Sequence, residues 1–235
     1  MNDIIHVFEF VSRAPSVPLA DFSEHWIETN REWIADEPAA RQCSVLTRFP
    51  QDDDAEPPAA DGVLELWFES QAEYTRFQQR RASDEKYRTA LAKILASPPG
   101  HRLITRDHVI FNRRPVANDD ELVKLLYVIR RADGIDLEHF SRYYEHVHTL
   151  YADKVPFQRN YVQAHRAPEL GEEEPEFDGV SCIWFEDRAG LDGYLASEEL
   201  VLGVADCERF LDLTRFFSIA GMEHRLRWAG LSTSV

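Results

Sequence analysis

The sequence predicts an α+β protein built from two βαββαβ units joined in one chain. The first observation is an internal repeat: residues 61–69 read DGVLELWFE, and residues 178–186 read DGVSCIWFE. The second is that further matches keep almost the same spacing, so each half has about the size of one compact unit. These matches pair Arg13-Ala14 with Arg131-Ala132, Phe22-Ser23 with Phe140-Ser141, Ala82-Ser83 with Ala196-Ser197, and Asp107-His108 with Glu223-His224.

The third observation is the order of elements, which is clearest in the second half. A β-rich run over Val123–Arg131 ends at the turn signal Asp133-Gly134. Asp136 can then cap a helix that ends before Pro156, because apolar residues recur there at helical spacing. Strands over 157–165 and 179–186 form a hairpin, helical segments cover 188–213 with a break near Ser197, and a last strand covers 216–227.

The first half follows the same order. We expect strands over 4–11, 42–49, 62–69 and 103–111, with helices beginning at Leu19 and Gln71. The predicted domains are residues 1–112 and 122–235, joined by a linker over 113–121. A βαββαβ unit is ferredoxin-like: both helices lie on one face of an antiparallel sheet, and the other face is left apolar. Two such sheets can cover each other face to face, which predicts a barrel-like pseudo-dimer within the chain. Further homodimerisation stays open.

Composition excludes several classes of protein. The 235 residues carry 26 basic and 42 acidic side chains, and a surface with a net charge of −16 repels nucleic acid and anionic lipid. No apolar run is long enough to span a membrane, and the N-terminus does not have the pattern of a signal peptide. We therefore expect a cytoplasmic protein without a membrane or nucleic-acid partner. Three cysteines without metal-type spacing predict neither disulfides nor a metal site.

His148 is the main candidate for chemistry. Tyr144, His148 and Tyr151 are spaced i, i+4, i+7 on the predicted helix, so they share the face that looks at the sheet. An inward imidazole among tyrosines can be shifted in pKa and held in one tautomer, which suits a general acid or base. The same position also suits a hydrogen-bonded core histidine without a catalytic role.

The two halves differ at this position. The helix alignment places Asn30 opposite His148, and an amide cannot exchange a proton near neutral pH. The strand alignment places Glu9 opposite Tyr127. These mismatches predict one working site in the second half and a supporting copy in the first.

A pocket between this helix and the sheet is expected to bind a small molecule. Strand parity places Tyr127 and Trp184 each on one face of its strand, and we expect both faces to look at His148. Core packing is the alternative reading for Trp184. His224, on the closing strand, is a second acid–base candidate, although His108 holds the same position in the first half. The expected substrate-binding residues are Tyr127, Trp184, Tyr161 and Tyr151, and the expected catalytic residues are His148, Tyr144 and His224.

Several other chemistries have no signal in the sequence. There is no glycine-rich phosphate loop and no Gly-x-Ser-x-Gly elbow. His146 and His148 lie two apart on a helix and face different directions, so they do not form a metal-binding pair. We therefore expect no metal and no cofactor, and a small-molecule substrate as the partner.

Five segments together resemble the EthD family of dimeric α+β barrel proteins: residues 124–131, 140–150, 178–180, 184–185 and 196–198. The resemblance covers almost the whole second half, and the first half is a divergent copy. It implies ferredoxin-like units paired sheet to sheet, with a small-molecule pocket in each unit. It also implies that the helix histidine of the family falls on His148 and is replaced by Asn30 in the first half.

The resemblance implies cofactor-independent chemistry on small aromatic, polyketide-like or lactone compounds. The leading hypothesis is a lyase or isomerase that decarboxylates, dehydrates, cyclises or isomerises its substrate. His148 would act as general acid or base, with Tyr127, Tyr144 and His224 orienting the substrate or stabilising an enolate. The alternatives are a cofactor-free monooxygenase, a non-enzymatic protein that holds a hydrophobic metabolite for a partner, and a structural barrel whose pocket is filled by its own side chains.

Overall fold

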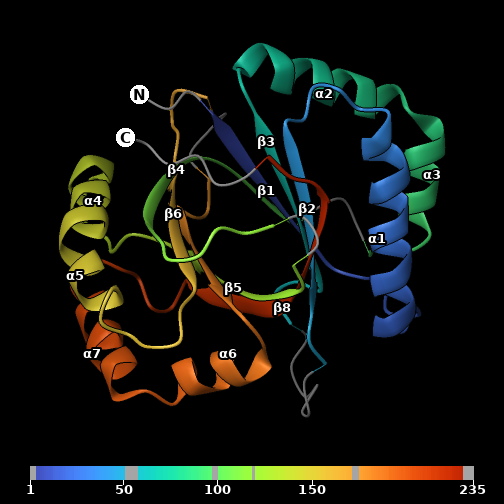
Figure 1. Ribbon diagram of the computed structural model, residues 1–235. Helices are drawn as coiled ribbons and strands as arrows, with labels where there is room; N and C mark the ends of the chain where they lie inside the picture. Colours follow the sequence, from blue (N-terminus) through green and yellow to red (C-terminus); the bar gives the residue numbers. More distant parts are fainter. Residues whose placement is uncertain (1–3, 51–57, 97–99, 118–119, 171–174, 230–235) are drawn as a thin grey trace.

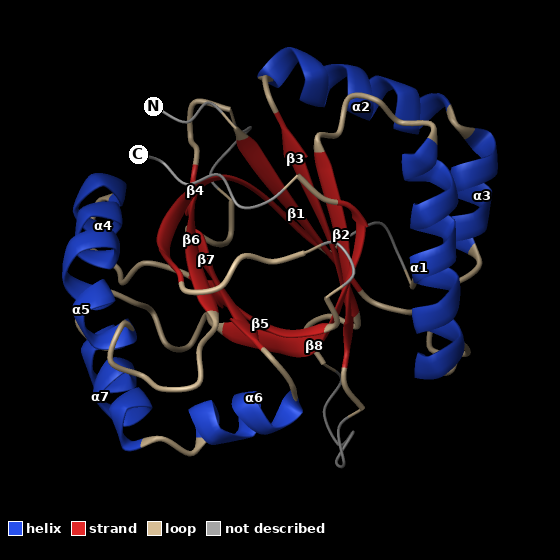
Figure 2. Ribbon diagram, in the orientation of Figure 1, coloured by secondary structure: helices blue, strands red, loops and turns tan. Residues whose placement is uncertain are grey.

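Eight strands close into one barrel, and the helices lie outside it in two groups (Figures 1 and 2). The computed structural model describes residues 4–50, 58–96, 100–117, 120–170 and 175–229. The first unit contains β1 (Ile5–Val11), α1 (Leu19–Ala35), β2 (Gln42–Arg48), β3 (Gly62–Phe68), α2 (Gln71–Ser83), α3 (Glu85–Ala92) and β4 (His101–Asn112).

The second unit repeats this order with more breaks in its helices. It contains β5 (Leu122–Ile129), α4 (Leu137–Tyr143), the π-helical turn η1 (Tyr144–His148), α5 (Thr149–Ala152), β6 (Asn160–Arg166), β7 (Gly179–Phe185), α6 (Arg188–Leu195), α7 (Glu198–Cys207) and β8 (Phe217–Arg227). Each unit is thus a βαββαβ set, and the predicted fold class is confirmed.

Side-chain caps set the helix boundaries that the sequence indicated. The Asp136 carboxylate accepts a hydrogen bond from the backbone N–H of His139 at 2.7 Å, so α4 begins where the sequence predicts. Ser197 caps α7 and separates it from α6, and Asp84 separates α2 from α3 in the same way. The last helix ends at Cys207 instead of running to residue 213.

One predicted strand begins later than expected. The sequence places a strand at residue 157, but β6 begins at Asn160. Phe157 has a φ of 71°, a left-handed conformation that a bulky side chain adopts only where its surroundings impose it, and that interrupts an extended strand. Its ring lies over Gly193, where an added Cβ would be 3.0 Å from ring atoms. The missing side chain at Gly193 therefore makes room for the turn.

The barrel closes because the last strand of each unit also pairs with a strand of the other unit. β4 pairs with β1 of its own unit and with β6 of the other, while β8 pairs with β5 and with β2. All pairings are antiparallel, in the order β1-β3-β2-β8-β5-β7-β6-β4, so each of the described strands pairs on both sides. At the β2–β8 seam the backbones approach closely: a Cβ on Gly221 would lie 1.9 Å from the carbonyl oxygen of Thr47.

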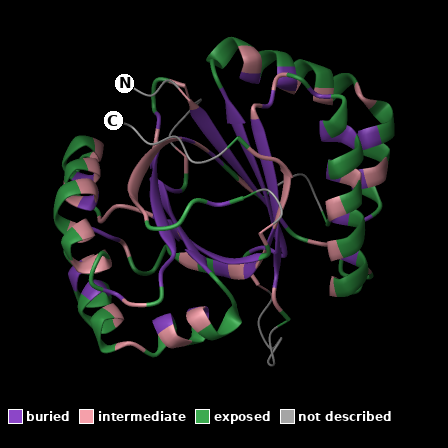
Figure 3. Cartoon of the chain, in the orientation of Figure 1, coloured by how far each residue is buried: buried purple, intermediate pink, exposed green. Residues whose placement is uncertain are grey.

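Six of the strands are almost wholly buried, β4 and β8 are only partly buried, and the helices expose their outer faces (Figure 3). Inside the barrel, apolar side chains surround a set of buried charges. The ammonium of Lys124 lies 2.6 and 2.7 Å from the two carboxylate oxygens of Glu65 and 3.1 Å from Glu223. Lys124 belongs to β5 and Glu65 to β3, so this ion pair joins the two units. Lys124 also lies 4.3 Å from the ring centre of Trp184, a cation–π contact.

A second pair of charges extends this interior cluster. The His6 Nδ1 lies 2.8 Å from Asp107, and its Nε2 lies 3.3 Å from Glu65. Burial alone would lower the pKa of His6, but the two carboxylates outweigh burial and raise that pKa above its usual 6.5.

Among the described residues, no helix is both long and apolar enough to cross a membrane.

Candidate active site

A cavity of about 450 Å³ lies in the second unit, between the outer face of its sheet and the helices that cover it. This volume falls within the range of small-molecule sites, roughly 300 to 1,000 Å³. Its walls are mainly aliphatic and aromatic, and Val204, Leu213 and Phe216 are exposed at its rim. The polar side chains that line it are Tyr127, Tyr144, His148, Gln158, Tyr161, Ser181, Tyr194 and Ser218.

The structure brings four of the seven predicted site residues into this cavity. Tyr127 comes from β5, Tyr161 from β6, and Tyr144 and His148 from η1. Tyr127 faces the cavity because strand alternation turns Tyr127 and Ile129 outward, toward the helices. Elements that are distant in the sequence thus contribute to one site.

Trp184 does not belong to the cavity, and the sequence-based placement is wrong here. Strand parity correctly grouped Trp184 with Cys182, but that face of β7 looks into the barrel interior. The indole Nε1 of Trp184 donates a hydrogen bond to Glu223 at 2.9 Å, inside the barrel. The neighbouring Ser181 and Ile183 face the cavity in its place.

Tyr151 and His224 also lie outside the cavity lining. A regular α-helix would place Tyr151 on the face of Tyr144 and His148, but the π-turn inserts an extra residue and rotates the helix beyond it. His224 lies on β8 opposite Val45 of the first unit, and its Nε2 is 3.4 Å from the hydroxyl of Thr47. It belongs to the seam between the units, where strand pairing and not helix packing determines its surroundings.

A carboxylate holds the imidazole of His148. The Nδ1 of His148 lies 3.0 Å from Oδ2 of Asp206, near the end of α7. The other oxygen of Asp206 accepts a hydrogen bond from the Tyr143 hydroxyl at 2.8 Å. Because Asp206 accepts from Nδ1–H, Nε2 carries the lone pair, and within the described residues Nε2 has no hydrogen-bond partner.

Burial sets the protonation state of this histidine. Desolvation lowers the pKa of His148 below its usual 6.5, and the hydrogen bond and charge of Asp206 oppose part of that shift. His148 is therefore neutral near pH 7. A neutral imidazole with its Nδ1–H fixed by a carboxylate is the arrangement that a general base requires.

A hydrogen-bond network fixes two of the cavity tyrosines, Tyr144 from η1 and Tyr161 from β6. The hydroxyl of Ser181 lies 2.5 Å from that of Tyr144 and 3.3 Å from that of Tyr161. The Gln163 amide donates to the Tyr161 hydroxyl at 3.1 Å and to the backbone carbonyl of Tyr144 at 2.9 Å. Gln163 thereby ties the first residue of the π-turn to the sheet.

The tyrosines stay protonated, and the cavity cysteine is not a nucleophile. Burial raises the pKa of Tyr144 well above 10, and it raises the pKa of Tyr127 to about 12. Burial likewise raises the pKa of the Cys207 thiol to about 12, so no reactive thiolate forms at neutral pH. The tyrosines can therefore donate hydrogen bonds to an oxygen in the cavity.

The cavity is free of charged side chains as far as the described residues line it. Its polar groups are hydroxyls, one amide and His148, and Asp206 lies behind the histidine instead of at the surface of the cavity. Such a lining favours a neutral ligand, because a buried charge without a partner is costly.

In the described part of the chain, no three His, Cys, Asp or Glu side chains are grouped to hold a metal ion.

Sequence reasoning missed Asp206, Ser181 and Gln163. The signal for Asp206 was present: Gly203, Asp206 and Phe210 are spaced i, i+3, i+7, so an acid occupies the inward face of a predicted helix. Ser181 and Gln163 could not be found in this way, because choosing them requires knowing which face of each strand looks outward.

Comparison with known proteins supports both the fold and the resemblance. Residues 132–214 match the family model described as the EthD domain. No curated protein matches the chain. The fold resembles an anthrone oxidase-like protein with a TM-score of 0.63 at 12% identity, covering 96% of this chain and 94% of that one.

Two other solved structures share the fold at similar coverage. A proposed monooxygenase from Fusobacterium nucleatum gives a TM-score of 0.59 at 7% identity, over 95% of this chain and 92% of the other. A chlorite dismutase variant from Candidatus Nitrospira defluvii gives 0.54 at 10% identity, over 96% and 93%. Identities this low show the shared dimeric α+β barrel fold alone. Residues 132–214, which match the EthD domain model, lie in the second unit, the half whose sequence motifs resemble that family.

Proposed function

We propose that the second unit is an enzyme that moves a proton at a carbon atom of a small, neutral, aromatic or cyclic substrate. The observation that carries the proposal is the pair of His148 and Asp206, 3.0 Å apart, at the wall of an apolar cavity that could hold such a molecule. The proposed reaction class is that of a cofactor-independent lyase or isomerase.

The chemistry follows from the hydrogen bonds of the site. Nε2 of neutral His148 would take a proton from a carbon that is next to a carbonyl group or conjugated with one through an aromatic ring, and the carboxylate of Asp206 would stabilise the imidazolium that forms. A protonated tyrosine hydroxyl would stabilise the enolate oxygen. Return of the proton to a different carbon gives an isomer, and loss of a leaving group from the neighbouring carbon gives a lyase product.

A cofactor-free monooxygenase is the second candidate. Its support is the likeness of the whole chain to proteins named as anthrone oxidase-like and as a monooxygenase. The same enolate would react with molecular oxygen: a ring CH₂ group becomes a carbonyl, one oxygen atom enters the product, and the other leaves as water. Both candidates share the first step, so His148 is the residue to test.

Hydrogen exchange measures that first step directly. Anthrone, a neutral tricyclic ketone with an acidic CH₂ group, serves as the probe in D₂O under nitrogen, with exchange followed by NMR. The protein should accelerate exchange, and His148→Gln should lower the accelerated rate roughly 100-fold or more. His146→Gln is the matched control, because His146 is exposed in the same helical turn and should leave the rate unchanged. An unchanged rate in His148→Gln would exclude this role.

Adding oxygen separates the candidates. Oxygen consumption that depends on His148 identifies a monooxygenase, whereas exchange without consumption supports the lyase or isomerase. A protein that only holds a hydrophobic metabolite would bind anthrone and leave its exchange rate at the value in buffer.

A further inference from the structure

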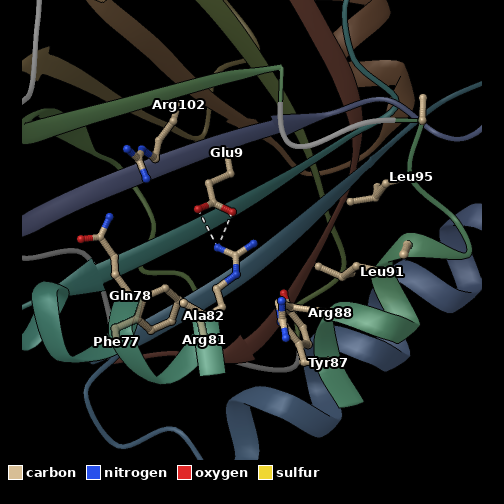
Figure 4. A pocket seen from close by; sticks show the side chains of 12 residues that line it. Glu9, Phe77, Gln78, Arg81, Ala82, Tyr87, Arg88, Leu91, Leu95 and Arg102 are labelled. Atoms are coloured by element: carbon tan, nitrogen blue, oxygen red, sulfur yellow. Dashed lines mark hydrogen bonds and ion pairs between the residues drawn. The ribbon is translucent and has the colours of Figure 1, made fainter. Parts of the chain in front are cut away.

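The first unit contains a larger cavity in the equivalent place. It has a volume of about 660 Å³ and lies between the strands β1 and β4 and the helices α2 and α3 (Figure 4). Phe77 comes from α2, while Leu91 at the end of α3 and Leu95 just beyond it supply apolar wall. The divergent half of the chain has therefore kept an open pocket instead of filling it with its own side chains.

This cavity has lost the acid–base pair. Two equivalent hydrogen bonds align the helix ends: the backbone N–H of Ala14 donates to the carbonyl of Ile94, as that of Ala132 donates to Phe210. Ala90 precedes Ile94 by four residues and so takes the place of Asp206. Asn30 replaces His148 and is held by two hydrogen bonds: it accepts one from the Tyr87 hydroxyl at 2.7 Å and donates one to the carbonyl of Trp26 at 2.7 Å.

The cavity has gained charge where the other has none. Among the described residues that line it, Glu9 is the only acid and Arg81 pairs with it, so Arg88 leaves this lining positive in a chain whose net charge is −16. The positive charge of the pocket attracts anions, whereas the acidic surface around it repels them.

Glu9 fixes one of these arginines in position. Both carboxylate oxygens of Glu9 lie 2.6 Å from Nη1 of Arg81, and Figure 4 shows the pair beside Tyr87. The Arg81 guanidinium also lies 5.4 Å from the ring centre of Tyr87 and 5.9 Å from that of Phe77. Among the described contacts, Nε and Nη2 of Arg81 are left uncommitted, which leaves two donors on an immobilised group for a ligand.

We propose that the cavity of the first unit binds, without converting it, a small organic anion: an aromatic carboxylate whose rings lie against Phe77 and Leu91. The carboxylate would accept hydrogen bonds from the arginines, which match its planar geometry. The Glu9 carboxylate would repel the ligand if it were free, but it is neutralised by Arg81. This site is independent of turnover in the second unit.

Calorimetry with two matched probes tests the proposal. Naphthalene-2-carboxylate carries the charge, and 2-naphthamide has the same ring system without it. The full-length protein should bind the carboxylate at least about tenfold more tightly than the amide, and the double variant Arg88→Gln/Arg102→Gln should lose this preference. Both arginines are exposed, so their replacement should not prevent folding.

The controls separate this site from general electrostatics and from the other cavity. Arg142→Gln/Arg215→Gln removes two exposed arginines in the second unit, with the same change in net charge, and should keep the preference. His148→Gln should keep it too. Equal affinity for the two probes, no binding of the carboxylate at millimolar concentration, or loss of binding in His148→Gln would each overturn the proposal.

Discussion

His148 and Asp206 are joined by a 3.0 Å contact between Nδ1 and Oδ2, and they come from a π-turn on one helix and the last turn of another. π-turns are rare and occur frequently at functional sites. Here the turn keeps His148 directed at the cavity while Tyr151 leaves that face.

Replacing Asp206 with Asn should change the pH profile as well as the rate. Asp206 raises the pKa of His148 against the larger effect of burial, so its loss should lower that pKa further. The acidic limb of the rate should therefore move to lower pH. Turnover should fall at least about tenfold, because an amide can donate to Nδ1 and place the proton on Nε2.

Tyr143→Phe is the comparison for Asp206→Asn. It removes the hydrogen bond to the other oxygen of Asp206 but keeps the carboxylate, so the loss of rate should be smaller. The pH dependence of kcat/KM on the exchange probe measures both effects. An acidic limb that stays in place in Asp206→Asn would show that Asp206 does not act on His148.

Lys124→Met should destabilise the barrel strongly. The substitution leaves Glu65 and Glu223 buried without their cation, and breaking a buried ion pair in this way costs roughly 3 to 5 kcal/mol. Lys86→Met removes the exposed partner of Glu32 and should change stability little. Urea unfolding compares the two, and equal midpoints would mean that the interior ion pair contributes nothing.

His6 should make stability fall as the solution becomes alkaline. Its pKa in the folded protein lies above the unfolded value of 6.5, so its stabilising effect is complete below pH 6.5. The effect is lost as pH rises through the folded pKa, where the imidazolium beside Asp107 and Glu65 loses its proton.

The difference in melting temperature between the wild type and His6→Gln isolates this effect. The difference should be largest at acidic pH and shrink above pH 6.5. Subtraction removes the contribution of buried histidines such as His165, whose pKa burial lowers to about 3 and which act in the opposite direction. A difference in melting temperature that does not change with pH would mean that His6 neither gains nor loses its proton in the pH range measured.

Gly221→Ala should open the seam between β2 and β8. The new methyl group would meet the carbonyl of Thr47 at 1.9 Å, so the backbones must separate, at a cost of at least about 2 kcal/mol. Gly190→Ala is the matched control: its methyl group meets neighbours at 3.5 Å or more, and alanine is favoured in α6 by roughly 0.5 to 1 kcal/mol. Chemical denaturation would show the contrast.

The sequence predicted the fold closely because local signals agree with the global arrangement. The cap at Asp136 and the break at Ser197 each depend on residues near one another in the chain, and the repeat shows the same local order of elements twice. The late start of β6 was not predictable, because the conformation of Phe157 depends on Gly193, thirty-six residues away.

The lining of the cavity in the second unit was predicted in part, because sequence patterns describe strands and helices one at a time. Periodicity gives which residues share a face, and this grouping was right for Tyr127 and for Trp184. It does not say which face looks at the helices, so Tyr127 was placed correctly and Trp184 was not. Helical spacing placed Asp206 on an inward face, but its contact with His148 depends on the packing of two helices, which no local pattern describes.

The double pairing of β4 and β8 has a consequence for how the two cavities can change. In a barrel of two identical subunits every substitution occurs twice, and dilution can separate the halves. Here the seams β4–β6 and β2–β8 are formed within one chain. The two cavities are therefore present in equal number at any concentration, and a mutation can alter one of them while the other keeps its chemistry.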